Sequence, residues 1–510
     1  MSRSRALLLL LSLTLVAGGV YAAVRFFAPA SDDAVELVPA NAVLYVNLFI
    51  EPSTEQKLAL EDLVAHFERI GTPEEAGEQI AELFDRLLAG SGLSFEDDVE
   101  PWLGPQVALF LTSFDAVPDG AMLIAADDEA AAETALRRAV SAQGEPTRRD
   151  YRGTSYLFDG YTASGLVDGF AVIGSEPGLK AVIDVAARRL RPLSATAAFD
   201  RATRGLEPDR LALVYLDLVR AVPSAAKRAQ VELLLGEQSS FALTVHARSD
   251  GLVFESSSAV APGGASVLWA PTGSGLLGEL PASAWLGAGG EDLGERAEAL
   301  LELGTASATG VDLDTVLAQL RRTFGFDLRA HLTDWMGDFG LFFAGGRSDE
   351  VRGALVVESR DRAASTAGLL ELERLLLSLG LPVERQPPGG GPGFALELPG
   401  LEEPLVVLDG GARVALALGR AAADRVLGPG ETLERSALFA RARRALGDGF
   451  ELNLFVDVQA VRGLIEAAGA LDDPTYATEV RSWLEPLGYL AAGTRRQGDA
   501  LVSRMMIGVR

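Results

Sequence analysis

The chain contains no cysteine and only three histidines among its 510 residues. The absence of cysteine excludes disulfides, thiolate metal sites, a cysteine nucleophile and a lipid-modified N-terminal cysteine. The three histidines, His66, His246 and His331, are separated by 180 and 85 residues. They therefore lack the close spacing of a histidine-based metal motif, and we expect no metal site and no cofactor.

Positive charge is also scarce, because 45 Lys and Arg residues stand against 71 Asp and Glu residues, which gives a formal charge of −26. A chain this acidic does not hold a nucleic-acid backbone through general electrostatics. We therefore expect no nucleic-acid partner.

Recognised catalytic patterns are missing or lack their context. The G-x-G-x-x-G match at residues 273–278 is followed by Glu279-Leu280-Pro281 and an expected strand, whereas a dinucleotide loop opens a helix. The S-x-x-K match at residues 224–227 lacks the partner motifs of penicillin-binding enzymes. We read the first as a linker and the second as a solvated helix, and we expect a protein without catalytic activity.

Two acidic triplets, residues 96–98 and 127–129, are the remaining candidates for a cation. Asp127 or Asp128 is better explained as the N-cap of the following helix. Weak calcium binding is the alternative at either triplet.

The first thirty residues have the composition of a membrane anchor. Residues 6–24 are uncharged, and a helix of this length spans roughly 28 Å, close to the hydrocarbon core of a bilayer. Arg3 and Arg5 precede the segment and Arg25 follows it, so the positive-inside rule leaves the N-terminus in the cytoplasm. We expect a single-pass inner-membrane protein whose bulk is periplasmic. Secretion after signal cleavage near Ala22 is the alternative.

The rest of the sequence repeats itself. The segment at residues 91–111 aligns with residues 324–344, which places Trp102 on Trp335, and residues 199–218 align with 439–458, which places Asp217 on Asp457. Further blocks follow in the same order, so we predict a tandem duplication. The predicted domains are residues 35–262 and 278–510, after the anchor and short linker at residues 1–30.

Each repeat alternates short apolar strands with amphipathic helices. Runs such as VLYVNL, VALFL and AMLIAA have the length and boundaries of strands, and neighbouring strands follow one another without an intervening helix. This pattern predicts an α+β fold in which each domain is a largely antiparallel sheet packed on one face by helices. Further helices are expected at residues 72–88 and from Ser175 onwards, while the stretch at 387–393 is expected to be a loop.

The segments VPANAVLYVNL, GLSFEDDVEPWLG, YRGTSYLF and VDGFAVIGSEPGLKAVID together resemble the bacterial family known as domain of unknown function 3352. The resemblance covers most of residues 35–260 and, more loosely, 280–510. It implies an exported or membrane-tethered bacterial protein and supplies no catalytic positions. The second copy departs from the pattern where Gly287 replaces Tyr45 and where Arg413 interrupts a predicted strand.

Three polar residues stand at or near the ends of apolar strands and are the candidate ligand-binding positions: Asp217, Asp457 and Asn47. A carboxylate at such a position accepts hydrogen bonds from the free N–H groups of a following helix. Structural capping is the favoured interpretation, and a shared ligand site is the alternative.

These observations predict a non-catalytic binding or scaffold protein of the bacterial envelope. Its expected partners are the cytoplasmic membrane, through residues 6–24, and an envelope protein or apolar ligand. The alternative is a periplasmic carrier of a lipid or other apolar molecule, because apolar residues make up 48% of the chain and glycine adds 55 more.

Overall fold

The computed structural model describes residues 31–67, 85, 93–114, 118–141, 146–222, 224, 240–259, 273–309, 312–385, 392–401, 403–498 and 500–510. The expected membrane anchor, almost all of the helix expected at 72–88, and most of the S-x-x-K segment and of the 387–393 loop lie outside these residues. Within the described part of the chain, no helix combines the length and apolarity needed to cross a bilayer.

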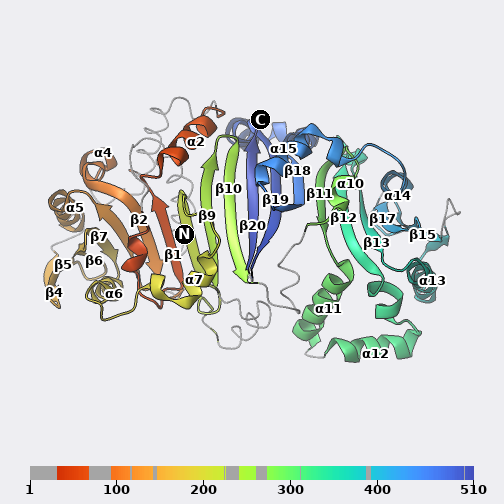
Figure 1. Ribbon diagram of the computed structural model, residues 1–510, viewed down its shortest axis with the longest axis horizontal. Helices are drawn as coiled ribbons and strands as arrows, with labels where there is room; N and C mark the ends of the chain where they lie inside the picture. Colours follow the sequence, from red (N-terminus) through yellow and green to blue (C-terminus); the bar gives the residue numbers. More distant parts are fainter. Residues whose placement is uncertain are drawn as a thin grey trace. The chain divides into compact units, whose positions relative to one another are not determined.

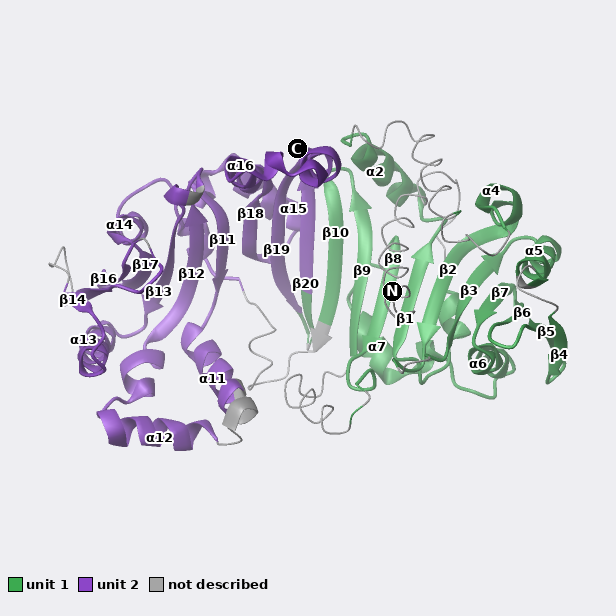
Figure 2. Ribbon diagram, turned by 180° about the vertical axis from the view of Figure 1, so that it is seen from behind, with its two compact units in different colours: residues 1–259, 497–502 green, residues 260–496, 503–510 purple. Residues whose placement is uncertain are grey.

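The chain forms two compact units (Figure 2). Unit 1 comprises residues 1–259 and 497–502, and unit 2 comprises residues 260–496 and 503–510. Each unit combines helices with a large antiparallel sheet (Figure 1). The predicted α+β class and largely antiparallel pairing are confirmed.

In unit 1 the sheet order is β4-β5-β6-β7-β3-β2-β1-β8-β9-β10, and every neighbouring pair is antiparallel. The strands are β1 (Leu44–Phe49), β2 (Leu103–Leu111), β3 (Gly120–Ala126), β4 (Thr147–Tyr151), β5 (Thr154–Phe158), β6 (Ala163–Val167), β7 (Phe170–Gly174), β8 (Ala212–Asp217), β9 (Ser240–Arg248) and β10 (Gly251–Ala259). The helices are η1 (Ala34–Glu36), α2 (Thr54–Val64), α4 (Phe95–Asp98), η2 (Glu100–Trp102), α5 (Glu129–Ser141), α6 (Glu176–Ala186), η3 (Leu193–Ala195) and α7 (Ala197–Thr203).

Unit 2 has the order β14-β15-β16-β17-β13-β12-β11-β18-β19, again antiparallel, and β20 pairs with β19. Its strands are β11 (Ala284–Gly290), β12 (Met336–Ala344), β13 (Arg352–Ser359), β14 (Val383–Arg385), β15 (Gly393–Leu396), β16 (Leu405–Asp409), β17 (Arg413–Leu418), β18 (Glu451–Asp457), β19 (Leu487–Gln497) and β20 (Ala500–Val509). Its helices are α10 (Leu276–Glu279), α11 (Leu293–Thr309), α12 (Leu313–Phe324), η4 (Arg329–Thr333), η5 (Ser348–Glu350), α13 (Arg362–Ser378), α14 (Arg420–Leu427), η6 (Leu433–Arg435), α15 (Ala437–Leu446), α16 (Val458–Ala467), η7 (Ala470–Asp472), η8 (Tyr476–Val480) and α17 (Arg481–Leu484).

The two units repeat the same tertiary hydrogen bonds. The Leu193 amide donates to the Val38 carbonyl at 2.7 Å in unit 1, and the Leu433 amide donates to the Leu280 carbonyl at 2.8 Å in unit 2. Each unit also closes the turn before its second strand with an indole. Trp102 Nε1 donates to the Asp98 carbonyl at 2.6 Å, and Trp335 Nε1 donates to the His331 carbonyl at 3.0 Å.

Local sequence explains where individual helices begin. Ser175 Oγ accepts the Gly178 amide at 3.1 Å and so caps the N-terminus of α6. Leu179 and Val182 then follow at helical spacing and are fully buried. The same logic applies to α7 and α15, where Thr196 and Ser436 accept the amides of Phe199 and Phe439.

Helices lie on both faces of the unit 1 sheet, so the expectation of a single covered face is wrong. Leu48 and Ile124 pack with residues of α5 in one core cluster. The Phe199 ring of α7 instead contacts Tyr45 and Tyr215, which point to the opposite face because side chains alternate along a strand. All six residues of β1 are buried, Tyr45 and Asn47 included, and the sequence pattern does not indicate that both faces of this strand are covered.

Candidate functional site

A buried polar cluster joins the start of unit 1 to its central strands. Its centre is Asp32, whose Oδ1 accepts the Tyr45 hydroxyl at 2.5 Å and Asn47 Nδ2 at 2.8 Å. Arg210, which precedes β8, places Nη2 at 3.5 Å from Asp32 Oδ2. The Arg210 and Asp32 side chains are only 15% and 11% exposed, so each charge is held largely out of water.

Gln106 of β2 completes this Asp32 cluster and ties it to the backbone of the N-terminal segment. Its Oε1 accepts Asn47 Nδ2 at 3.0 Å and the Ala34 amide at 3.2 Å, and its Nε2 donates to the Ser31 carbonyl at 3.2 Å. These bonds fasten η1 onto the sheet. Among the described residues, Asn47 Oδ1 and Arg210 Nε have no hydrogen-bond partner.

Burial governs the acid–base behaviour of the cluster. It raises the pKa of Asp32, and the Tyr45 hydrogen bond and the Arg210 charge oppose that rise. Burial also raises the pKa of Tyr45 well above its usual value, with a further contribution from the Asp32 charge. The pKa of Arg210 is lowered by burial. The arrangement holds a segment in place through mutually dependent polar groups.

Unit 2 fills the corresponding place with leucines. Gly287 and Gly289 of β11 stand where β1 has Tyr45 and Asn47, and a Cβ on Gly287 would lie 2.8 Å from Leu277 Cδ1. Leu277 belongs to the G-x-G-x-x-G segment and is buried. The segment, expected to be a linker, contains the start of the short helix α10, and the strand expected after Pro281 is β11. The segment supplies core side chains and no nucleotide loop.

The three predicted site residues lie apart. Asn47 belongs to the Asp32 cluster on β1. Asp217 ends β8, where its Oδ1 accepts the Arg220 amide at 2.9 Å. Its own amide donates to the Val43 carbonyl, just before β1 begins. Asp457 lies in unit 2 and caps α16, because its Oδ1 accepts the amides of Gln459 and Ala460 at 3.0 Å each.

The acidic triplets also carry local structural bonds. Asp128 Oδ1 accepts the Ala130 and Ala131 amides at 3.0 Å each at the start of α5, which is the predicted capping arrangement. Asp98 pairs with Arg138. Within the described residues, no group of three or more carboxylate or imidazole side chains has an arrangement that could hold a metal ion.

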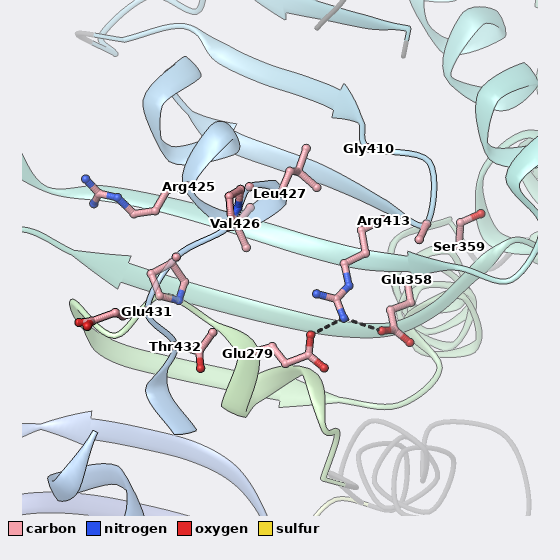
Figure 3. A pocket seen from close by; sticks show the side chains of 15 residues that line it. Glu279, Glu358, Ser359, Gly410, Arg413, Arg425, Val426, Leu427, Glu431 and Thr432 are labelled. Atoms are coloured by element: carbon pink, nitrogen blue, oxygen red, sulfur yellow. Dashed lines mark hydrogen bonds and ion pairs between the residues drawn. The ribbon is translucent and has the colours of Figure 1, made fainter. Parts of the chain in front are cut away.

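Each unit has a concavity between the segment before its first strand and the loop after α6 or α14. In unit 2 this concavity has a volume of about 630 Å³. Arg413 lies within it and pairs with Glu279 at 2.6 Å and Glu358 at 3.1 Å (Figure 3). Arg413 was expected to interrupt a strand, but it begins β17 and faces Glu358 on β13. The cross-strand charge pair explains why an arginine is accepted there.

The matching concavity of unit 1 has a volume of about 620 Å³. Its lining contains three arginines, Arg188, Arg189 and Arg191, together with the acids Glu36 and Asp168. The two concavities therefore have similar size and different charge.

Unit 1 also carries an apolar groove of about 320 Å³ on the sheet face that bears Val46, Leu109 and Met122. These side chains are neighbours because Val46 faces Leu109 and Leu109 faces Met122 across the ladder. Leu109, Met122 and Ile173 are half-buried. In unit 2, Phe343 stands opposite Leu286 and stacks on Trp285 with ring centroids 5.9 Å apart, so larger rings occupy that part of the face.

The family model described as "Protein of unknown function (DUF3352)" matches residues 5–492. The chain belongs to this family. The resemblance seen in the sequence is thereby confirmed, and membership of the DUF3352 family brings no described activity with it.

Other comparisons add little to the family assignment. No curated protein matches the chain. Among solved structures, crystal forms I and IV of TP0453 are similar at 12% identity each, with TM-scores of 0.26 and 0.25. The matches cover 46% and 45% of this chain and 81% of each TP0453 chain.

Sequence reasoning identified Asn47 but missed Asp32, Gln106 and Arg210. These residues come from three distant segments that only the strand register brings together. One signal was present in the sequence, since the polar Tyr45 and Asn47 have glycines as their counterparts in the second repeat.

Proposed function

We propose that this protein is a non-catalytic, extracytoplasmic binding protein of the bacterial envelope, tethered to the cytoplasmic membrane through residues 6–24. Its two units descend from one duplicated domain. Unit 1 binds the hydrocarbon chain of a lipid or a similar apolar ligand. This assigns the protein to the carrier class in preference to a scaffold.

The apolar groove of unit 1 is the observation that carries the proposal. Ligand sites are concave, mostly apolar and commonly 300–1,000 Å³ in volume, and the groove of about 320 Å³ is at the lower end of that range. Most of its lining residues come from β1, β2, β3 and β7, and Ser175 is the one polar side chain among them. A single hydrocarbon chain suits such a surface better than a polar metabolite does.

The Asp32 cluster supports the tethered arrangement. Asp32 lies only a few residues after Arg25, the positive residue that closes the expected anchor. The cluster binds this part of the chain to β1 and β2 through side-chain hydrogen bonds. A tether that is fastened to the central strands keeps unit 1 at the membrane surface, where a lipid is available.

The ligand is tested by lipid analysis of the purified full-length protein. Leu109→Arg places a charge in the groove, and Leu341→Arg places the same charge at the matching position of β12 in unit 2. We expect mass spectrometry to find bound lipid in the wild type and in Leu341→Arg, and a large loss in Leu109→Arg. Thermal unfolding of both variants checks that the fold survives, and Leu109→Trp provides an apolar variant that fills the groove.

Equal lipid content in all variants, or no lipid in the wild type, would contradict the carrier proposal. A protein partner recovered from solubilised membranes in place of lipid would favour the scaffold alternative.

The tether is tested separately. A C-terminal alkaline phosphatase fusion should be active, because this reporter folds only outside the cytoplasm. The intact mass of the mature protein distinguishes an uncleaved anchor from cleavage near Ala22. An inactive fusion would contradict the proposed location.

A further inference from the structure

The concavity at the C-terminal end of α6 in unit 1 concentrates positive charge in a strongly acidic protein. Arg188, Arg189 and Arg191 line it, against Glu36 and Asp168, while the whole chain has a formal charge of −26. The matched concavity of unit 2 has two arginines, Arg413 and Arg425, against three glutamates at 279, 358 and 431. The charge balance is therefore reversed between two sites of nearly equal volume.

Two of the unit 1 arginines have side chains that form no ion pair with the described part of the chain. Among the described residues, no carboxylate forms an ion pair with Arg188 or Arg189, and both side chains are exposed. The neighbouring Asp184 is already occupied, since its Oδ1 pairs with Arg152 at 2.8 Å and its Oδ2 accepts the Tyr151 hydroxyl at 3.0 Å. In unit 2, by contrast, Arg413 is neutralised by two glutamates (Figure 3).

Helix capping does not account for these arginines either. The terminal carbonyls of α6 are satisfied by backbone amides: Arg188 N donates to the Val185 carbonyl at 2.8 Å, and Arg189 N donates to the Asp184 carbonyl at 2.8 Å. Arg191 alone has a local role, because it donates to the Ala195 carbonyl.

The backbone at this site is strained in a way that unit 2 avoids. Arg188 has φ +56°, in the left-handed region that favours glycine. The loop after α14 begins instead with Gly428 at φ −93°. A bulky arginine kept in an unfavourable conformation points to a role for its side chain.

We propose that the Arg188–Arg189–Arg191 concavity of unit 1 binds a phosphate group. Guanidinium groups match phosphate oxygens with paired, charge-assisted hydrogen bonds. The phosphate belongs either to a small soluble anion or to a phospholipid headgroup. The half-exposed Leu190 (44% exposed) lies between these arginines in the sequence, so the test includes a lipid. This proposal is independent of the apolar groove.

The test is isothermal titration of the full-length protein in a neutral detergent. The probes are inorganic phosphate, pyrophosphate, and monomeric dihexanoyl-phosphatidylglycerol, with dihexanoyl-phosphatidylcholine as a zwitterionic control. The double variant Arg188→Gln/Arg189→Gln should weaken binding by at least about tenfold, because each charged hydrogen bond lost is worth roughly that factor. Arg425→Gln in unit 2 is the matched control and should leave binding unchanged.

Binding of phosphate or pyrophosphate that the double variant abolishes would identify a soluble anion as the source. Binding of phosphatidylglycerol alone, lost in the same variant, would identify a lipid headgroup. No binding of any anionic probe, or equal binding by wild type and double variant, would overturn the proposal. Arg188→Gly, which relieves the backbone strain, checks that weaker binding is not a folding defect, since it should bind less while unfolding at the same or a higher temperature.

Discussion

Units 1 and 2 fill the same position of the same sheet order with opposite chemistry. In unit 1, Tyr45 and Asn47 of β1 bind Asp32 in a buried polar network. In unit 2, Gly287 and Gly289 leave space that is occupied by Leu277 of α10, with Leu280 and Leu433 also beside Gly287. The volume between the first strand and the segment before it must be filled in both units, because interiors are close-packed. The fold therefore constrains volume at this position and leaves the chemistry free to diverge.

The comparison also separates the two units by their candidate ligand surfaces. Unit 1 has the apolar groove and the arginine-rich concavity. Unit 2 places paired charges in the matching concavity and aromatic rings near the matching face. These differences are the basis for proposing that unit 1 carries the binding function.

The largest effect is expected from Asp32→Ala. This change leaves Arg210 as a buried unpaired charge and removes the acceptor of Tyr45 and Asn47, which costs about 3–5 kcal/mol of the free energy of unfolding. Hydrogen exchange measured by mass spectrometry should show that the amides of β1 and β2 lose protection. The amides of β11 and β12 should keep theirs. Asp200→Ala, which breaks an exposed pair with Arg204, is the control and should cost under about 1 kcal/mol. Equal stability of the two variants would contradict the network.

A matching loss is expected from Leu280→Ala in unit 2. Leu280 is completely buried, and a Leu→Ala change in a core costs about 2–5 kcal/mol through lost burial and the cavity that remains. The same exchange experiment should now report lost protection in β11 and β12. Val38→Ala, at the corresponding position of unit 1, should cost less because fewer methyl groups are lost. If Leu280→Ala were neutral, the leucines would not be the counterpart of the polar network.

A smaller effect is expected from Tyr45→Phe. The substitution keeps the ring packed against Phe199 and removes only the hydroxyl that donates to Asp32, which costs about 1 kcal/mol. Denaturant unfolding measures this difference, and Tyr161→Phe, at a site 88% exposed, should change nothing. A cost as large as that of Asp32→Ala would show that the Tyr45 hydroxyl, and not the ion pair with Arg210, contributes most of the stability of the cluster.

The smallest effect concerns acid stability. Hydrogen bonds from Tyr156, Arg149 and Lys180 lower the pKa of Glu176 from 4.5 to about 2. Because the folded-state pKa is depressed, this stabilisation is complete above pH 4.5 and is lost as the pH falls toward about 2. Glu176→Gln should therefore weaken the pH dependence of the free energy of unfolding of unit 1 between those values. Unit 2 should show no such change, because α14 begins at Arg420.

The pKa of Asp32 is shifted in the opposite direction to that of Glu176. Its pKa is raised in the folded protein, so ionisation of Asp32 costs stability as the pH rises above 3.8. Comparing the pH dependence of Asp32→Asn with that of Glu176→Gln separates the two contributions. If the free energy of unfolding fell more steeply with decreasing pH in Glu176→Gln than in the wild type, this assignment would be contradicted.

The sequence was sufficient for the α+β class, the antiparallel pairing and several helix caps, because strand length, adjacent strands and Ser or Asp at helix starts are local signals. It was not sufficient for the two-sided helical cover, because all six residues of β1 are buried, Asn47 included, and the residue types alone do not show that both faces are covered. The Asp32 cluster depends on residues from three segments more than fifty positions apart, such as Asn47 and Gln106. Such a site requires the strand register, which local patterns do not supply.

The most direct test of the central claim is photo-crosslinking of the full-length protein with a diazirine-labelled fatty acid, followed by peptide mapping. We predict labelling of peptides from β2 and β3 around Leu109 and Met122, and its loss in Leu109→Arg but not in Leu341→Arg. Labelling of β12 and β13 to the same extent, or labelling unaffected by Leu109→Arg, would contradict the assignment of ligand binding to unit 1.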